Sequence, residues 1–256
     1  MADALFAGKT VVIAGSGRGL ALGMARRFGR AGAHLVVADT DARAGRDVVQ
    51  VLLEEGHSAS YEVFEPRDPE RVAALVERIG EGGGRIDVWV NNLFIEHKGA
   101  AETLAHEAWR ESIDLILSGA FYCSQAAGRH MLRQGWGTII NVTSIDGYQA
   151  VEGNVAPCAA HAGLVMLTQA LGVEWACRGI RVVGVAPGTI TTDFPRKAAG
   201  ADPDQRRMYE HRTPLRRLGT VEEVAETVLY LASEEASYVT AETMKVDGGW
   251  TAYQMF

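Results

Sequence analysis

The sequence contains few cysteines. Its 256 residues include three of them, Cys123, Cys158 and Cys177. An odd number of cysteines at wide spacings fits neither a disulfide framework nor a zinc-binding pattern. We therefore expect no metal site, and thiols of this kind indicate a reducing compartment, the cytoplasm.

Long apolar runs and an excess of basic residues are also missing. No stretch of about 18 consecutive apolar residues occurs, and the N-terminal MADALFAGKT is too short and too polar for a signal peptide. The 32 acidic residues outnumber the 25 basic ones, which gives a formal charge of −7. We therefore expect neither a membrane nor a nucleic-acid partner. The composition, 47% hydrophobic and 22% charged, is that of a globular protein.

The sequence has instead a regular alternation of short β-rich runs and helical patterns. Several runs are continuously apolar, which is typical of parallel strands covered on both faces. Helical periodicity is clear at Leu20–Arg30, and Gly56 stands in the helix-stop position after Ala42–Glu55. The predicted strands are Thr10–Ala14, His34–Ala38, Ala59–Phe64, Asp87–Val90, Thr138–Val142, Ile180–Val185 and Met244–Val246. The alternation predicts one α/β domain over residues 1–256, a Rossmann-type doubly wound parallel sheet with helices on both faces.

A glycine-rich turn follows the first predicted strand and opens a helix. It reads Gly15-Ser16-Gly17-Arg18-Gly19-Leu20-Ala21. Glycines let backbone amides approach a pyrophosphate, and the helix N-terminus adds partial positive charge. Asp39 ends the next strand, where a carboxylate accepts both ribose hydroxyls and repels a 2′-phosphate. The pattern predicts an NAD site at Gly15, Ser16, Arg18, Gly19, Leu20 and Asp39. The alternative is a tight turn that binds nothing.

With its further motifs, the sequence resembles the short-chain dehydrogenase/reductase family over essentially its whole length. The motifs are Asn91-Asn92-Leu93-Phe94, Asn141-Val142-Thr143-Ser144, Ala186-Pro187-Gly188 and Val246-Asp247-Gly248-Gly249. The resemblance implies the strand order 3-2-1-4-5-6-7, an NAD-dependent oxidoreductase, and a dimer or tetramer. It also places Asn91 in the cofactor site and makes Ser144 the catalytic serine.

The other catalytic positions of the family depart from its pattern. The family uses a tyrosine as general acid/base and a lysine four residues later, on one helix face. Here Pro157 and His161 stand at those two positions. The family's catalytic asparagine falls on Ile116. Of the four positions, Ser144 alone keeps the family's residue.

The cofactor cleft departs from the family too. Its aspartate–valine pair after the third strand is Glu65-Pro66 here, and proline has no N–H to offer the adenine edge. Leu93 and Phe94 replace a small alanine–glycine pair that lies against the cofactor. Each loss is expected to cost about 1–3 kcal/mol of binding free energy. Weakened binding of NAD is therefore expected.

Other side chains are candidates for replacement chemistry. Ser144 and His161 are expected to face one cleft, which suits acyl transfer, unless His161 simply fills the space of the missing lysine. Tyr148 either supplies a phenol or lines the substrate pocket, as this position does in the family. Cys158 is either an activated thiol or a buried, inert cysteine.

The region 189–220 is rich in basic residues. They are Arg196, Lys197, Arg206, Arg207, Arg212, Arg216 and Arg217. One interpretation is that they bind an anionic substrate such as an acyl-CoA. The other is that they belong to solvated helix faces.

Three functions are compatible with this pattern of losses. The favoured one is a catalytically silent subunit, a pseudoenzyme paired with an active relative in a hetero-oligomeric dehydrogenase, because a partner relieves selection on both damaged subsites. Such a pair resembles the heteromeric hydroxyacyl-CoA dehydrogenases, among them the one that acts on an aromatic substrate in anaerobic toluene degradation. The alternatives are an enzyme rewired around Ser144 and His161, and an NAD-dependent oxidoreductase with an unidentified acid/base.

The helix predicted over Val155–Cys177 is apolar around most of its circumference. A helix of this kind needs a second partner besides its own sheet. In the family, this helix and the preceding one form a four-helix bundle with a neighbouring subunit. We therefore expect an active relative to dock there, with the C-terminal residues 253–256 reaching across to it.

Overall fold

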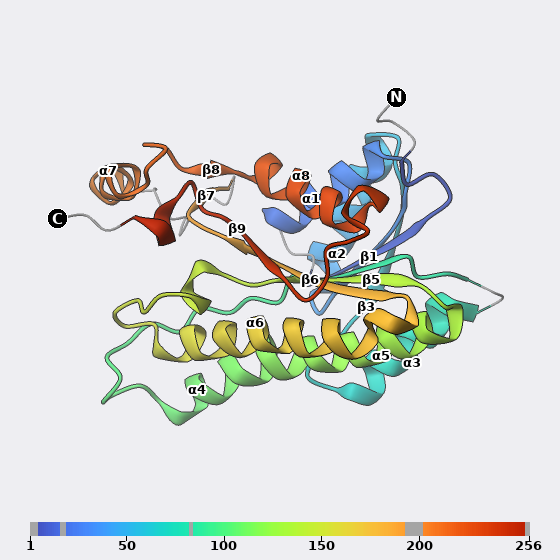
Figure 1. Cartoon of the computed structure of the whole chain (residues 1–256), viewed down its shortest axis with the longest axis horizontal. Helices are drawn as coiled ribbons and strands as arrows, with labels where there is room; N and C mark the ends of the chain where they lie inside the picture. The colour runs from blue at the N-terminus through green and yellow to red at the C-terminus, as the bar shows by residue number, and fades with distance from the viewer. Residues whose placement is uncertain (1–4, 16–18, 82–83, 193–201, 254–256) are drawn as a thin grey trace.

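A seven-stranded parallel sheet forms the centre of the molecule (Figure 1). The computed structural model describes residues 5–15, 19–81, 84–192 and 202–253. The strands are β1 (Thr10–Ala14), β2 (His34–Asp39), β3 (Ser58–Val63), β4 (Val88–Asn91), β5 (Gly137–Val142), β6 (Ile180–Pro187) and β9 (Thr243–Val246). Their order is β3-β2-β1-β4-β5-β6-β9, and every neighbouring pair is parallel. This confirms the predicted sheet and its order. The short pair β7 (Ile190–Thr191) and β8 (Gly219–Thr220) was not predicted.

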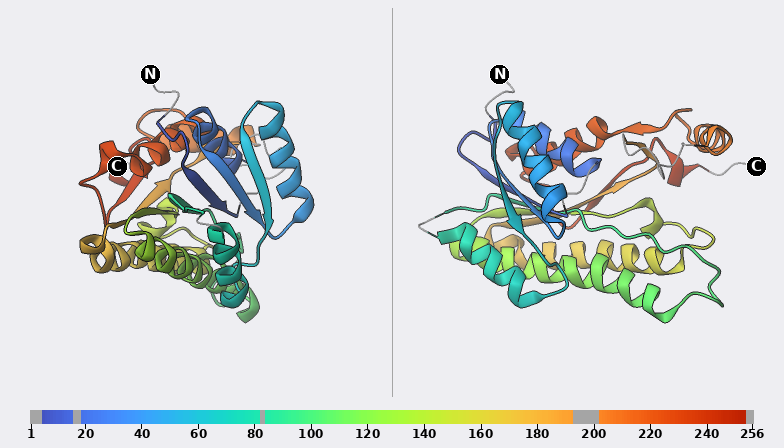
Figure 2. Two further views of the ribbon diagram at one scale, coloured as in Figure 1. Left: turned by 90° about the vertical axis from the view of Figure 1, so that its right-hand side faces the viewer. Right: turned by 180° about the vertical axis from the view of Figure 1, so that it is seen from behind.

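Helices cover both faces of the sheet, as predicted (Figure 2). On one face lie α1 (Leu20–Arg30), α2 (Ala42–Glu54) and α8 (Val221–Ala232). On the other lie α3 (Pro69–Gly80), α4 (His106–Ser112), the π-helical η2 (Ile113–Gly119), α5 (Ala120–Gln134) and α6 (Val155–Trp175). Helix α7 (Pro203–Arg212) lies at one end of the molecule (Figure 1). Short 3-10 turns are η3 (Ile145–Gly147), η4 (Ala176–Arg178), η5 (Glu234–Ala236) and η6 (Trp250–Ala252).

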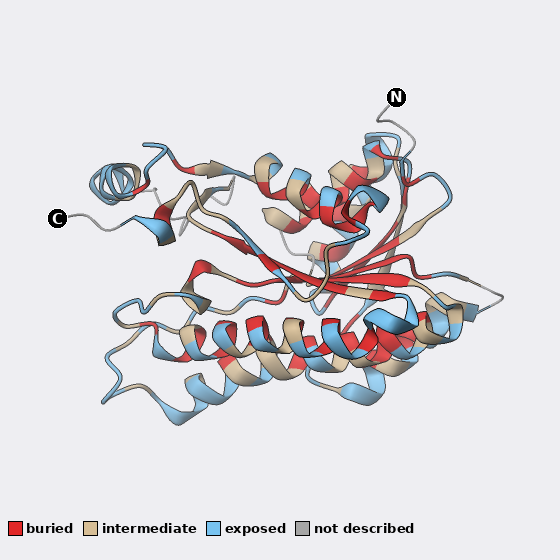
Figure 3. Ribbon diagram, viewed as in Figure 1, coloured by how far each residue is buried: buried red, intermediate tan, exposed pale blue. Residues whose placement is uncertain are grey.

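The buried core has two layers, one on each side of the sheet. Val11 and Ile13 pack against α1 and α8, whereas Val12 packs on the opposite face with residues of α3 and α5. Because successive side chains point to opposite faces of a strand, a strand buried on both sides must be apolar at every position. This explains the continuous apolar runs of the sequence and the buried, red strands of Figure 3.

Local signals in the sequence set the helix ends. The side chain of Asp41 accepts hydrogen bonds from the first-turn amides of α2, and Asp68 does the same for α3. Thr220 and Glu223 form a capping box at the start of α8. Each cap satisfies backbone donors that have no partner within the helix. Gly56, with a φ of 83°, lies just after α2, where a helix stop was expected.

Helix α6 is long and apolar enough, by length and composition, to cross a membrane. Half of its most apolar window is nevertheless buried inside the protein. Leu164, Leu171 and Trp175 of this helix belong to the core beneath the sheet. Packing of this kind is that of a core helix, so α6 alone is weak evidence for a membrane span.

Candidate active site

The glycine-rich turn brings two strand ends into direct contact. Gly15 has a φ of 79°, and a Cβ built on it would lie 2.5 Å from the backbone oxygen of Asn92. The side-chain amide of Asn92 donates to the Gly15 carbonyl at 2.8 Å. Glycine is therefore required at position 15 both by its backbone conformation and by the close approach of β4's end. Gly19 also has a positive φ, and Leu20 begins α1. Ser16 and Arg18 lie outside the described residues.

Asp39 ends β2 as predicted and is 8% exposed. Its Oδ1 accepts a hydrogen bond from the backbone N–H of Asp41 at 2.8 Å. In the part of the chain that the structure describes, Oδ2 of Asp39 has no hydrogen-bond partner. An unpartnered carboxylate oxygen at this strand end suits a ribose diol, because the diol supplies the missing donors.

A cavity of about 290 Å³ lies between these two features. It is lined by Gly15, Asp39, Thr40, Phe64, Pro66, Asn92, Leu93, Phe94 and Leu115. Leu93 is buried and packs towards Gly119 of η2, and Phe94 is 67% exposed. Both side chains line the cavity, as expected, and a cavity of about 290 Å³ remains beside them. With its glycine approach and its carboxylate, the cavity fits the adenosine half of a dinucleotide.

Asn91 does not line this cavity, contrary to expectation. It is 1% exposed, and its side chain is held in a buried polar network. Its amide nitrogen donates to Asn141 Oδ1 at 2.8 Å and to Ser124 Oγ at 3.0 Å, while its oxygen accepts from the Trp89 indole at 2.7 Å. Asn141 continues the network to Thr168 of α6. Asn91 therefore ties β4 to β5 and α5, and the following residue, Asn92, is the one that lines the cleft.

Ser144 stands just after β5 and starts the η3 turn. Its Oγ accepts a hydrogen bond from the backbone N–H of Asp146 at 3.1 Å. Asn154 Nδ2 donates to the Asp146 carboxyl at 2.7 Å, and the neighbouring Ser144 hydroxyl helps to lower the pKa of that carboxyl. Sequence reasoning missed Asp146 and Asn154, because it searched the family's own positions. An acidic residue two positions after Ser144 was the signal that could have found Asp146.

Pro157 lies in the first turn of α6, which explains why the helix tolerates it. The first-turn amides have no acceptor within the helix, so the missing N–H breaks no helical hydrogen bond. Pro157 is buried and carries no group that exchanges protons.

His161 lies one turn further along α6 and is 2% exposed. Its Nδ1 is 3.3 Å from the hydroxyl of Thr143, and its Nε2 has no hydrogen-bond partner among the described residues. Burial lowers the pKa of the imidazole to about 4, so it is neutral at physiological pH. A neutral ring does not reproduce the charge of a lysine. The hydrogen bonds described for His161 go to Thr143 and not to Ser144, so the suggested Ser144–His161 pair is not formed.

Ile116 lies inside η2 and is fully buried in the core. A π-helical turn widens the helix locally and is often found at functional sites. Here its inward position carries an aliphatic side chain. The hydrogen bonds of the family's asparagine are therefore absent from this position.

Of the two remaining candidates, Tyr148 is 38% exposed and Cys158 is half-buried. Burial raises the pKa of the Tyr148 phenol, and the ammonium of Lys245 lies 4.6 Å from the centre of its ring. Burial also raises the pKa of the Cys158 thiol, which argues against an activated thiolate. Neither group has a base placed to activate it among the described contacts.

Most of the described basic residues of the 189–220 region have partners of their own. Arg206 pairs with Glu210, Arg207 with Asp204 and Arg217 with Glu223. Arg212 lies over the ring of Trp250, and Arg216 donates to the carbonyl of His211. Arg196 and Lys197 lie outside the described residues. The described part of the region thus has the pairing of a solvated surface.

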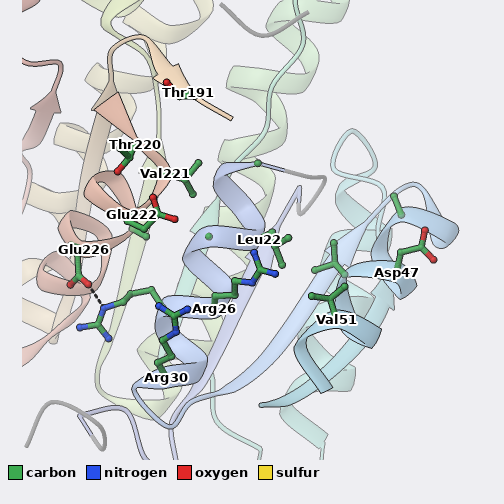
Figure 4. A pocket seen from close by; sticks show the side chains of 16 residues that line it. Leu22, Arg26, Arg30, Asp47, Val51, Thr191, Thr220, Val221, Glu222 and Glu226 are labelled. Atoms are coloured by element: carbon green, nitrogen blue, oxygen red, sulfur yellow. Dashed lines mark hydrogen bonds and ion pairs between the residues drawn. The ribbon is translucent and has the colours of Figure 1, made fainter. Parts of the chain in front are cut away.

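A larger cavity, of about 560 Å³, lies between α1, α2 and α8 (Figure 4). Its floor is apolar, and three arginines of α1 line it. Arg27 pairs with Glu226, as the dashed line shows. Nε and Nη2 of Arg26 both donate to the Glu55 carboxylate. Neither Ser144 nor Asp39 lines this larger cavity. We therefore place the candidate active site in the smaller cavity and at the end of β5.

Comparisons with known proteins identify the chain's relatives. The family model described as enoyl-(acyl carrier protein) reductase matches residues 14–251. A 3β-hydroxysteroid dehydrogenase of Eggerthella lenta is 38% identical over 251 residues, which cover 97% of this chain and 96% of the relative. The cis-4-hydroxycyclohexanecarboxylate dehydrogenase of Sinomonas cyclohexanicum is 38% identical over 248 residues, covering 96% and 98%. A gluconate 5-dehydrogenase from Burkholderia cenocepacia, solved with NADP and tartrate, has a TM-score of 0.92 at 31% identity and covers 98% and 99%.

The expectation of a catalytically silent subunit is wrong in the light of these relatives. They match nearly the whole chain and are named as dehydrogenases, and nothing in the comparisons indicates a silent subunit. The prediction gave too much weight to Pro157 and His161. The structure keeps a cleft with the Asp39 carboxylate and a hydroxyl on Ser144 despite those two replacements. Sheet order, site and relatives together show that the chain belongs to the short-chain dehydrogenase/reductase family.

Proposed function

We propose that this chain is an NAD-dependent oxidoreductase that interconverts a secondary alcohol and a ketone. The observation that carries the proposal is the placement of Asp39 after β2 and Ser144 after β5, at the same edge of one parallel sheet. In doubly wound sheets, ligands bind beyond the carboxyl ends of the strands. One edge thus offers a carboxylate for the ribose and a hydroxyl for the substrate oxygen.

The cofactor would supply the hydride acceptor of the reaction. Gly15, Asn92 and Asp39 would hold its adenosine half in the cavity beside η2. Pro66 withholds one backbone donor from the adenine edge, at a cost of about 1–3 kcal/mol. The carboxylate of Asp39 favours the 2′-hydroxyl of NAD over the 2′-phosphate of NADP, because like charges repel.

The substrate we favour is a secondary alcohol on a carbocyclic ring. Two relatives that are 38% identical to this chain carry names that describe such a hydroxyl, on a steroid and on a cyclohexane. An acyl-CoA is less well supported, since Arg206, Arg207 and Arg217 are each paired within the chain. These arginines would have to leave their carboxylates before they bound a phosphate.

Turnover by the purified chain tests the proposal. The chain is incubated with NAD⁺ and either cis-4-hydroxycyclohexanecarboxylate or a 3β-hydroxysteroid, and NADH formation is followed by absorbance. We expect turnover with at least one of these alcohols and saturable binding of NADH by calorimetry. Failure of both measurements on folded protein would contradict the proposed function.

We also propose that α5 and α6 pair with the same helices of a second copy. Four large apolar side chains on these helices are exposed, namely Phe121, Val155, Met166 and Val173. Val173 is 74% exposed, although it lies on a helix whose other faces are buried. Covering such a stripe removes apolar surface from water at about 25 cal/mol per Å². The C-terminal residues 254–256, expected to reach a partner, lie outside the described residues.

Replacement of Val173 with aspartate is expected to dissociate the oligomer. A charge in the middle of an apolar contact must lose its water without a partner, so the dissociation constant should rise about 100-fold or more. Sedimentation velocity over a concentration series measures this. Tyr238→Asp is the matched control, because Tyr238 is fully exposed and lies outside α5 and α6. An unmodified chain that remains a monomer at high concentration would refute the pairing.

A further inference from the structure

Asp146 forms a compact polar cluster with Ser144 and Asn154. The Asp146 backbone N–H donates to Ser144 Oγ at 3.1 Å, and the Ser144 hydroxyl helps to lower the pKa of the Asp146 carboxyl. Asn154 fixes the other side of the carboxyl, with its Nδ2 at 2.7 Å from Oδ2. Asn154 is itself 7% exposed, and its Oδ1 has no hydrogen-bond partner among the described residues. Asn154 thus holds one oxygen of the carboxyl, in a residue whose backbone contacts the hydroxyl that the family uses in catalysis.

This carboxyl lies beside the place of the missing phenol. Asn154 immediately precedes α6, and Pro157 is the third residue of that helix. The charge of Asp146 also raises the pKa of Cys158, the residue after Pro157, which places the carboxyl close to the first helical turn. The protein therefore has a proton-exchanging carboxyl near the N-terminal end of α6, the helix that lacks the family's tyrosine.

The surroundings of Asp146 favour a carboxyl that can exchange protons. Burial raises its pKa above the ordinary value, against the hydrogen bonds from Asn154 and Ser144 and the positive charge of Lys98. Glu96 opposes Lys98, and the two are paired at 2.6 Å on the loop after β4. A pKa displaced towards neutrality makes the carboxylate a stronger base and increases the protonated fraction that can act as the acid near neutral pH.

We propose that Asp146 is the general acid/base of this enzyme and acts through the Ser144 hydroxyl. This inference rests on the proposed oxidoreductase function. In alcohol oxidation, the carbinol C–H bond breaks and its hydride leaves for NAD⁺. The substrate hydroxyl proton passes to Ser144 Oγ while the Ser144 proton passes to the Asp146 carboxylate, and the O–H electron pair forms the carbonyl. Asp146 then releases the proton to solvent, and ketone reduction runs the same steps in reverse.

The other titratable groups near the site are less suited to this role. His161 is neutral, buried and bonded to Thr143 rather than to Ser144. Tyr148 lies against Lys245 of β9, and its ring shows no described contact with Ser144. Among these three residues, Asp146 alone has a described hydrogen bond with Ser144, from its backbone N–H to Oγ.

Replacement of Asp146 with asparagine tests the inference. Asparagine keeps the shape and can still accept from Asn154, but it cannot take up a proton. With NAD⁺ and cis-4-hydroxycyclohexanecarboxylate or a 3β-hydroxysteroid, we expect kcat to fall about 10²–10⁴-fold, the range for a lost general acid/base. NADH affinity by calorimetry should stay within about twofold, because Asp146 does not line the cofactor cavity. Asp47→Asn, an exposed aspartate of α2, is the matched control.

The pH dependence gives a second readout. Oxidation needs the carboxylate, so kcat/KM for the alcohol should rise as pH increases through the Asp146 pKa, and kcat/KM for the ketone should fall. In the Asp146→Asn variant, kcat/KM should no longer change with pH in this range. The pKa of Asp146 can be measured by carbon NMR of the ligand-free protein. The carboxyl resonance that is missing from the spectrum of the Asp146→Asn variant belongs to Asp146. Its pKa should lie above about 3.9, the ordinary aspartate value.

The outcomes separate the inference from the proposed function. An unmodified chain without turnover and without NADH binding refutes both. Turnover by the unmodified chain that persists in folded Asp146→Asn, or a carboxyl that titrates at or below the ordinary value, refutes the role of Asp146 alone. Loss of turnover in Tyr148→Phe, with Asp146→Asn fully active, would assign the proton transfer to Tyr148 instead.

Discussion

Replacing Ser144 with alanine is expected to lower kcat for alcohol oxidation about 10²–10³-fold, the effect of removing one catalytic hydrogen-bond donor. The hydroxyl has two tasks at the end of β5. It would contact the substrate oxygen, and in the proposed mechanism it would pass a proton to the carboxyl of Asp146, whose backbone N–H it contacts. Steady-state kinetics with NAD⁺ and cis-4-hydroxycyclohexanecarboxylate measure the change. NADH affinity should be unaltered, because Ser144 does not line the cofactor cavity.

The same substitution removes the hydrogen-bond acceptor for the Asp146 amide. A lost turn cap of this type costs about 1 kcal/mol of unfolding free energy, so thermal unfolding must show that the variant is folded at the assay temperature. Ser58→Ala, on the edge strand β3, is the matched control, since Ser58 contacts His34 far from the site. Full kcat in a folded Ser144→Ala variant would exclude the hydroxyl from the reaction.

Replacing Asp39 with alanine is expected to shift the cofactor preference from NAD⁺ towards NADP⁺ about 100-fold, which corresponds to about 2.7 kcal/mol. Two effects add. Charge-assisted hydrogen bonds to the ribose, worth about 1.5–3 kcal/mol each, are lost. Repulsion of a 2′-phosphate, about 1–4 kcal/mol at close range, also disappears. The ratio of kcat/KM for the two cofactors measures the shift.

A variant that removes a charge elsewhere controls for long-range electrostatics. Asp47→Asn on α2 lowers the net negative charge in the same way but does not line the cofactor cavity. It should leave the preference within about twofold. An Asp39→Ala chain that still strongly prefers NAD⁺ would show that another residue determines the choice between NAD⁺ and NADP⁺.

The sequence predicted the sheet because its signals are strong and local. The apolar runs at Thr10–Ala14 and Ile180–Pro187 are buried on both faces, and only parallel central strands need this. The β7–β8 pair was missed because two residues in each strand carry no detectable periodicity. The sequence correctly predicted that the second strand ends at Asp39.

The candidate site was harder to predict, because it depends on which way neighbouring side chains point. Asn91 and Asn92 are adjacent in sequence. The side chain of Asn91 is nevertheless buried in a hydrogen-bond network, whereas Asn92 lines the cofactor cavity. A strand places successive residues on opposite sides, and the sequence does not say which side is which. Asp146 was missed for a different reason: its link to Asn154 depends on how η3 packs against the start of α6.

Hydride transfer by the unmodified chain is tested most directly with an alcohol that carries deuterium at the carbinol carbon. The purified chain is incubated with NAD⁺ and deuterated cis-4-hydroxycyclohexanecarboxylate or 3β-hydroxysteroid, and mass spectrometry follows deuterium into NADH. We predict deuterated NADH and an equal amount of ketone, both strongly reduced in Asp146→Asn. Absence of deuterium in NADH with both alcohols, from a folded chain present in stoichiometric amount, would contradict the assignment of this protein as an active oxidoreductase.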